Sequence, residues 1–409
     1  MVFFLVATAL ALHIALWGAG LAVLAMPRPW HRFWPVLILP AGLALQSAAV
    51  WVGALSGLRG TETYAWASFI LPVGLLLAAS RRKRFSEARA DLARFAAVWA
   101  VATVTLIFLL LPLAVGLRGL TTISLGSCDA ADYAAGARVF MEFGRGSREG
   151  FLGLTEVVQV QSADNFFDYW IRLNHFTPAA LMALNGTILN CAPHELATIL
   201  TVMVLVCSVP LVFWIARSVL ALRGPSSVLV ALLYGMSPVT WYAVGQVAPS
   251  QLLAAMAIAL ITWAAISAWR LRRRGKAAWR LGGVLAIGYW LVLGSYNFIL
   301  IACLVPATAY VGVMALRRRE LSAVGRWTCV VLAPLAVCAV LFLGRVVGLV
   351  ERFTLLRSYD FGWRIPLLTP EGWLGFVGVA PSLAGMALFW RIALSVLLFA
   401  AVVIAFRQR

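Results

Sequence analysis

Long apolar runs alternate with short polar, arginine-containing segments along this chain of 409 residues. A helix that crosses a bilayer needs about 20 apolar residues in succession. Such runs predict an all-α polytopic membrane protein with about eleven transmembrane helices, at 2–26, 34–56, 64–80, 95–117, 196–217, 226–246, 250–269, 281–296, 298–316, 327–350 and 386–406.

Two of these runs, 281–296 and 298–316, follow each other with almost no loop between them. A single kinked helix is one alternative. Because the two runs together are far longer than one crossing requires, we expect a tight hairpin instead, with its turn at Gly294–Asn297 on the outer side of the membrane.

The composition agrees with a location in the bilayer. Apolar residues make up 63% of the chain and charged residues 12%, and the mean hydropathy is +0.94. A soluble domain has about 45–50% apolar and about 25% charged residues, so soluble enzymes and disordered proteins are excluded. The net charge of +18 comes from short basic runs between apolar stretches, such as 81–84 and 317–319, which favours a membrane protein over a nucleic-acid partner.

The basic loops predict the orientation of the chain. Two thirds of all Lys and Arg, but only Glu87, Asp91 and Glu320 among the 15 acidic residues, fall in the segments 27–33, 81–94, 217–225, 270–280, 317–326 and 407–409. Cytoplasmic loops carry such an excess of Lys and Arg, so we expect the N-terminus outside and the C-terminus in the cytoplasm. We expect no cleavable signal peptide, because Met1–Phe4 has no basic residue. The Arg-rich, Lys-poor composition indicates a GC-rich bacterial genome and hence a bacterial inner (plasma) membrane.

Two long polar segments remain on the outer side, at 118–195 and 351–385. Loops of this length usually carry function. The chain then divides into three parts. Residues 1–94 hold three transmembrane helices and a basic cytoplasmic loop, 95–350 hold a core that includes the loop 118–195, and 351–409 hold an outer segment and a final helix.

The first outer segment contains a helix start near Ser127, followed by Asp129, Asp132 and Gly136. A spacing of three places both aspartates on one helix face. A carboxylate at the membrane surface can accept the proton of a sugar or lipid hydroxyl during a displacement. The alternative is that the two aspartates only cap the helix and favour its positive end.

The order of motifs resembles the first outer loop of the GT-C superfamily, the integral-membrane glycosyltransferases that use polyprenyl-phosphate sugars. Relatives carry Asp-Glu-x-x-Tyr after a membrane span and then a His-Pro-Pro-like element. The aspartate of that pattern corresponds to Asp129, its tyrosine to Tyr133, and the later element to His175–Pro178. The second acidic position is Ala130 here and the additional acid is Asp132, so both aspartates stand as candidate bases.

The resemblance implies a GT-C-like seven-helix core with a large helical first extracytoplasmic loop. It also implies an inverting transfer of sugar from a polyprenyl-phosphate-linked donor to a hydroxyl of a glycan, lipid or protein acceptor, for a cell-envelope glycan. Membrane lipids are expected partners, and nucleic acid is not. No cofactor is certain: Asp129 and Asp132 could bind a divalent cation, but no third clustered ligand is evident.

A polyprenyl-phosphate leaving group develops negative charge, so its site needs fixed cations or donors. Arg345, Arg352 and Arg357 are the candidates, and snorkelling to anionic headgroups is the alternative for each. The other candidate binding residues are Tyr133, His175, Arg172, Tyr296 and Asn297. The alternative for His175 is an ordinary interfacial histidine, that for Arg172 is an ion pair with Asp168, and that for Asn297 is a plain turn.

Two other functions compete with glycosyl transfer. One is a lipid or solute transporter or flippase, and the other is a non-catalytic assembly partner that docks through the outer loop. Ion-coupled transporters usually place ionisable residues at mid-membrane, and the predicted spans contain essentially none away from their ends. The enzyme hypothesis therefore predicts that a carboxylate near residue 129 faces cationic side chains beyond residue 350 across a groove open to lipid.

Overall fold

The computed structural model describes residues 2–58, 65, 68–81, 88–125, 129–144, 170–171 and 175–358, and helices are the only regular elements in these ranges. Eight stretches are long and apolar enough to cross a membrane. They are α1 (Val2–Ala25), η1 with α2 (Arg28–Phe33, Trp34–Leu55), α6 (Ala96–Gly116), α11 (Pro193–Ser218), α12 with α13 (Gly224–Gly235, Pro238–Gly245), α14 (Pro249–Arg270), α17 (Leu300–Arg318) and α18 (Leu321–Leu341).

Three further apolar helices are shorter: α4 (Ile70–Arg81), α10 (Phe176–Leu189) and α16 (Gly282–Gly294). The remaining helices are α5 (Ala88–Arg94), α7 (Asp129–Glu142), α15 (Gly275–Trp279), η3 (Asn297–Ile299) and α19 (Leu343–Ser358). The polytopic all-helical architecture is thus confirmed, whereas the count of eleven spans is not, and the run 386–406 lies outside the described residues.

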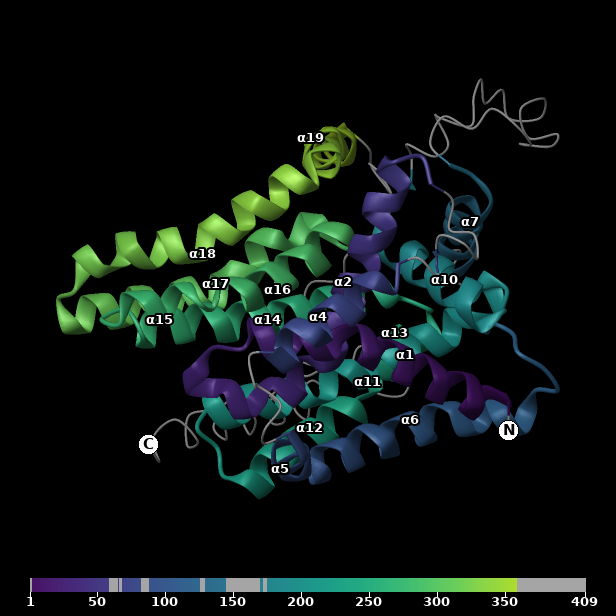
Figure 1. The fold of residues 1–409 in the computed structure, drawn as a ribbon, viewed down its shortest axis with the longest axis horizontal. Helices are drawn as coiled ribbons and strands as arrows, with labels where there is room; N and C mark the ends of the chain where they lie inside the picture. Colours follow the sequence, from purple (N-terminus) through teal and green to yellow (C-terminus); the bar gives the residue numbers. More distant parts are fainter. Residues whose placement is uncertain are drawn as a thin grey trace, which may run out of the picture.

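The helices lie along one another in an elongated bundle (Figure 1). The turn between α17 and α18 lies at the same end as α15, and arginines occur at 317–319 beside that turn and at 272–274 and 280 on the two sides of α15. Helices α7 and α10 lie at the opposite end. Helix α16 therefore starts, and α17 finishes, at the basic end, which is the hairpin expected for these two runs.

The expected span at 327–350 is wrong in its bounds. Helix α18 already begins at Leu321 and ends at Leu341, and after Phe342 the chain starts the separate helix α19, which runs in another direction (Figure 1). Residues 343–358 contain Arg345, Glu351, Arg352 and Arg357, so they are too polar to continue an apolar span. Arg345 therefore lies in the first turn of α19 and not inside a spanning helix.

The run at 226–246 is also interrupted, because Ser237 and Pro238 divide it into α12 and α13. Proline cannot donate a backbone hydrogen bond and is suited to the first turn of a helix. The Ser237 hydroxyl accepts a hydrogen bond from the backbone N–H of Val239 and so caps the second helix.

A buried polar network joins the N-terminal helices to α10. The His13 Nδ1 and the Asn185 Oδ1 are 2.7 Å apart, and the Asn185 Nδ2 donates to the Gln46 Oε1 at 3.0 Å. The Trp17 indole donates to the His13 Nε2 at 2.9 Å. Every residue of α10 from Phe176 to Gly186 is buried, so this part of the helix has no polar face toward solvent. Asn185 has its partners inside the bundle, and packed helices cover the other faces.

Candidate functional site

Helix α7 begins at Asp129 and carries both predicted carboxylates in its first turn. Asp129 is half-buried and Asp132 is exposed. The N-terminal end of a helix favours negative charge, so capping by these residues remains compatible with the geometry. Ser127 and Cys128 lie outside the described residues, and Cys191, which could have formed a disulfide with Cys128, is a free thiol.

The opposite side of the first turns of α7 is buried against the segment that precedes α10. A Cβ atom on Gly136 would lie 2.4 Å from the ring of Trp170, so only glycine permits this approach. Further along α7, the ring of Phe140 packs edge-on against Phe176, with centroids 5.3 Å apart. These contacts fix α7 on the end of α10 and hold its first turn in place.

His175 lies between α7 and the turn that follows α16. Its Nδ1 donates to the carbonyl oxygen of Ser295 at 2.7 Å, so the neutral ring presents Nε2 as an acceptor. The ring stacks on Tyr296 with centroids 5.2 Å apart and lies 6.0 Å from the ring of Tyr133. Three predicted residues from distant parts of the sequence therefore meet here.

Burial changes the acidity of the groups on α7. It raises the pKa of Asp129 above its ordinary value, and it raises the pKa of Asp132 with a further contribution from the negative charge of Asp129. The pKa of Tyr133 is also raised, first by burial and then by the charges of Asp129, Tyr296 and Asp132, while the hydroxyl of Ser250 opposes the shift. Tyr133 is thus a neutral phenol within electrostatic range of both aspartates.

Arg345 is completely buried, and its guanidinium bonds to two backbone carbonyls. Its Nε donates to the oxygen of Leu293 at 2.8 Å and its Nη1 to the oxygen of Ile171 at 3.0 Å. These two carbonyls are partners for the buried charge. Ile171 follows Trp170, which touches α7, so this residue pair connects α7 to the first turn of α19.

The structure describes some of the other predicted residues and leaves the side chains of others undescribed. Asn297 is buried at the start of η3, one residue after Tyr296. Arg352 and Arg357 lie on α19, but their side chains are outside the described part of the chain, and so are Arg172 and Asp168. The expected approach of the cations beyond residue 350 to the aspartates therefore stays a prediction.

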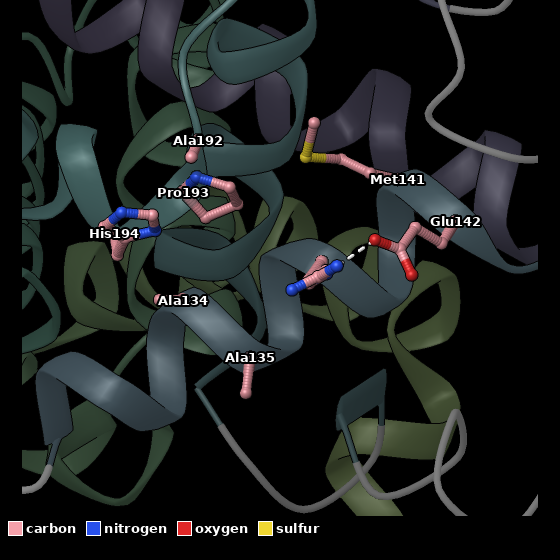
Figure 2. Close-up of a pocket in the computed structure, with 8 residues that line it drawn as sticks. Ala134, Ala135, Met141, Glu142, Ala192, Pro193 and His194 are labelled. Atoms are coloured by element: carbon pink, nitrogen blue, oxygen red, sulfur yellow. Dashed lines mark hydrogen bonds and ion pairs between the residues drawn. The ribbon is translucent and has the colours of Figure 1, made fainter. Parts of the chain in front are cut away.

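A hollow of about 550 Å³ opens beside α7 (Figure 2). Within it the Arg138 Nε donates to Glu142 at 2.6 Å, and His194 lies across from them. Asp132 is three residues before Ala135, which lines the hollow, so the two share a side of α7. The lining residues are Ala134, Ala135, Arg138, Met141, Glu142, Ala192, Pro193 and His194.

Sequence reasoning missed several groups of this site. The carbonyls of Ser295 and Ile171 carry no residue-type signal, because any residue has one. Ser250, in the first turn of α14, and Trp170 belong to no recognisable motif. Only the mixture of polar and aromatic residues in 168–178 singles out that stretch.

No family model, curated protein or solved structure matches this chain. In the ranges that the structure describes, no three His, Cys, Asp or Glu side chains come together as metal ligands would. The function must therefore be inferred from the chemistry of the site itself.

Proposed function

We propose that this protein is a membrane glycosyltransferase of the GT-C type. It moves a sugar from a polyprenyl-phosphate donor to an acceptor hydroxyl at the acidic end of the bundle. One observation carries the proposal: the carboxylates of α7 lie in one cluster with His175 and Tyr296, beside the start of α19. These residues lie far apart in the sequence, and each is a candidate for the site on sequence grounds: Asp129, Tyr133 and His175 through the resemblance, and Tyr296 through its place at the predicted outer turn.

In the proposed reaction, Asp129 or Asp132 takes the proton of the acceptor hydroxyl. The hydroxyl oxygen then attacks the anomeric carbon while the bond to the phosphate oxygen breaks, and polyprenyl phosphate leaves with the electron pair. A carboxylate whose pKa is raised is a stronger base than an exposed aspartate, provided that the pH lies above that pKa. The partial burial of the two aspartates suits this task.

The leaving phosphate needs donors on the other side of the sugar. The candidate donors there are the hydroxyls of Tyr133 and Tyr296 and the amide of Asn297, and His175 donates through Nε2 only when its ring is protonated. Arg345 already directs its guanidinium at two carbonyls, so in this proposal it holds the segment 170–171 in place. Arg352 and Arg357 then remain the first choices for direct phosphate binding.

The proposal is tested by measuring sugar transfer with the full chain. Bilayer discs containing the purified protein receive polyprenyl-phosphate hexoses and pentoses, and mass spectrometry follows release of polyprenyl phosphate that requires an acceptor. The double variant Asp129→Asn/Asp132→Asn should lose at least about 100-fold in rate, as expected when a general base is removed. Glu142→Gln, which removes an exposed carboxylate from the far end of the same helix, is the control and should keep its activity.

Equal rates for the double variant and the wild type would refute the proposal and favour an assembly partner. A parallel assay with EDTA tests whether a divalent cation binds between the aspartates. If it does, chelation lowers the rate of sugar transfer by the wild type.

One observation bears on the alternative of a transporter or flippase. His13 is an ionisable side chain in the middle of the spanning helix α1. Both of its ring nitrogens already have partners, Trp17 on one side and Asn185 on the other. A proton carrier needs a path for the proton and a change of partner, whereas this arrangement binds the neutral ring firmly. The network therefore favours a structural role for His13.

A further inference from the structure

A second hollow, of about 430 Å³, lies at the basic end of the bundle, far from α7. Two arginines from distant parts of the sequence line it. Arg28 begins η1, directly after α1, and Arg280 follows α15. The floor is apolar and comes from the end of α1 and the start of α16. Its residues are Leu24, Ala25, Met26, Pro27 and Gly283, and Trp279 completes the lining.

The two helix ends that form the floor approach each other closely. A Cβ atom on Gly283 would lie 3.1 Å from the Cβ of Ala25. This contact sets the spacing of the segments that carry Arg28 and Arg280. The hollow is thus part of the packed bundle, because it lies on a contact between two apolar helices.

Neither arginine of the hollow has a carboxylate partner within the described part of the chain. Glu320 pairs there with Arg272 and Arg273, and Asp91 pairs with Arg94. The acidic residues described at this end are therefore already bound to other arginines. Two guanidinium groups that share one hollow without a counter-ion form a site for an anion, and guanidinium matches phosphate oxygens in bidentate fashion.

The position of the hollow selects the source of the anion. It lies at the C-terminal end of α1, a candidate span, and at the N-terminal end of the apolar helix α16. The ends of such helices lie at the level of the lipid headgroups. Trp279 is 51% exposed beside Arg280, and tryptophan is enriched at the boundary between membrane and water. Basic pockets between helices at the cytoplasmic surface bind anionic headgroups. We propose that this hollow binds the phosphodiester headgroup of an anionic phospholipid of the surrounding bilayer.

Binding is measured by native mass spectrometry of the full chain in detergent, titrated with phosphatidylglycerol or phosphatidylcholine. The wild type should retain phosphatidylglycerol in preference to phosphatidylcholine. Arg28→Gln/Arg280→Gln should bind phosphatidylglycerol about 30-fold more weakly, since each basic residue near the surface contributes roughly fivefold. Arg317→Gln/Arg318→Gln removes the same charge from exposed positions of the same end, outside the hollow, and should bind like the wild type.

Equal weakening in the two double variants would overturn the proposal, because it would show a diffuse electrostatic effect. Displacement of the lipid by millimolar glycerol 3-phosphate would also overturn it in favour of a soluble anion. If Arg28→Gln/Arg280→Gln does not fold, the single variant Arg280→Gln takes its place, with about a fivefold loss expected. Retained phosphatidylglycerol affinity in that variant counts against the site.

Discussion

Asp129 and Asp132 lie one turn apart on α7 but in different surroundings. Asp129 is half-buried, whereas Asp132 is exposed and lies three residues before Ala135, which lines the hollow in Figure 2. Their charges are coupled, because Asp129 raises the pKa of Asp132. This coupling offers a way to identify the base.

The first prediction concerns the pH dependence of transfer. The base works only when ionised, so the rate should fall below a pKa that lies above the ordinary value of about 3.9. Asp129→Asn removes a negative charge and therefore lowers the pKa of Asp132. If Asp132 is the base, this variant stays active and its acid limb moves to lower pH. If Asp129 is the base, the variant is inactive at every pH. A pH–rate profile decides, and an active variant with an unmoved acid limb contradicts the coupling.

Arg345 gives a second prediction, on stability. Replacing it with Met leaves the carbonyls of Leu293 and Ile171 without their donor inside a packed region. An unsatisfied buried polar group costs about 1–3 kcal/mol, so we expect a loss of about 2–5 kcal/mol in the free energy of unfolding. Thermal unfolding in detergent measures it. Arg326→Met, at an exposed position of α18, is the control, and equal losses in both variants would contradict the assigned role.

At this scale the sequence was a partial guide. It identified Tyr133, His175 and Tyr296, which meet in the structure, because their residue types suit the expected chemistry. It could not show that Arg345 binds backbone carbonyls, because a carbonyl acceptor is the same in every residue. Arg345 is observed to bind backbone carbonyls, and its role in binding phosphate stays a prediction.

At the scale of elements, α10 is the helix on which the site depends most. His175 lies at its N-terminal end, and Asn185, further along, connects it to α1 and α2. The N-terminal helices thus hold the site in place without lining it.

The third prediction follows from that connection. Asn185→Ala leaves His13 and Gln46 without their shared partner, and hydrogen bonds between membrane helices contribute about 0.6–1.7 kcal/mol each. We expect a loss of about 1–3 kcal/mol in unfolding free energy, together with a lower transfer rate as α10 shifts. The control Thr187→Ala removes a hydroxyl that donates to the backbone oxygen of Ala183 in the same helix, and it should change both quantities less than Asn185→Ala does. An Asn185→Ala variant of wild-type stability would show that the network does not hold α10.

Apolar run length predicted the elements well where one helix fills one run, as in α1, α2, α11 and α14. It failed where a break is local. Ser237–Pro238 divides one run, and Phe342 ends α18 so that the polar residues of α19 can leave the span. Hydropathy averages over such breaks, whereas capping and helix direction depend on single residues and on neighbouring helices.

For the whole molecule, the separation of charge between the two ends is the main physical feature. The basic turns gather at one end and the acidic helix α7 lies at the other (Figure 1). The positive-inside bias predicts that α7 lies outside the cytoplasm, which a lipid-linked donor in the outer leaflet requires.

The fourth prediction tests this orientation. In a chain whose six native cysteines are replaced by serine, Ala135→Cys on α7 should react with a membrane-impermeant maleimide added to intact spheroplasts. Arg318→Cys at the turn after α17 should react only after the membrane is permeabilised. The reverse pattern would place the acidic end in the cytoplasm and remove the basis for an outer-leaflet donor.

The most direct measurement is a cryo-electron microscopy structure of the full chain with bound polyprenyl phosphate. We predict that the phosphate lies between the first turn of α7 and the start of α19, within hydrogen-bond reach of His175, Tyr296 or an arginine of α19. The lipid tail should then leave the site toward the bilayer. A phosphate bound elsewhere, with the cluster around His175 closed and unchanged, would contradict the assignment of this site to glycosyl transfer.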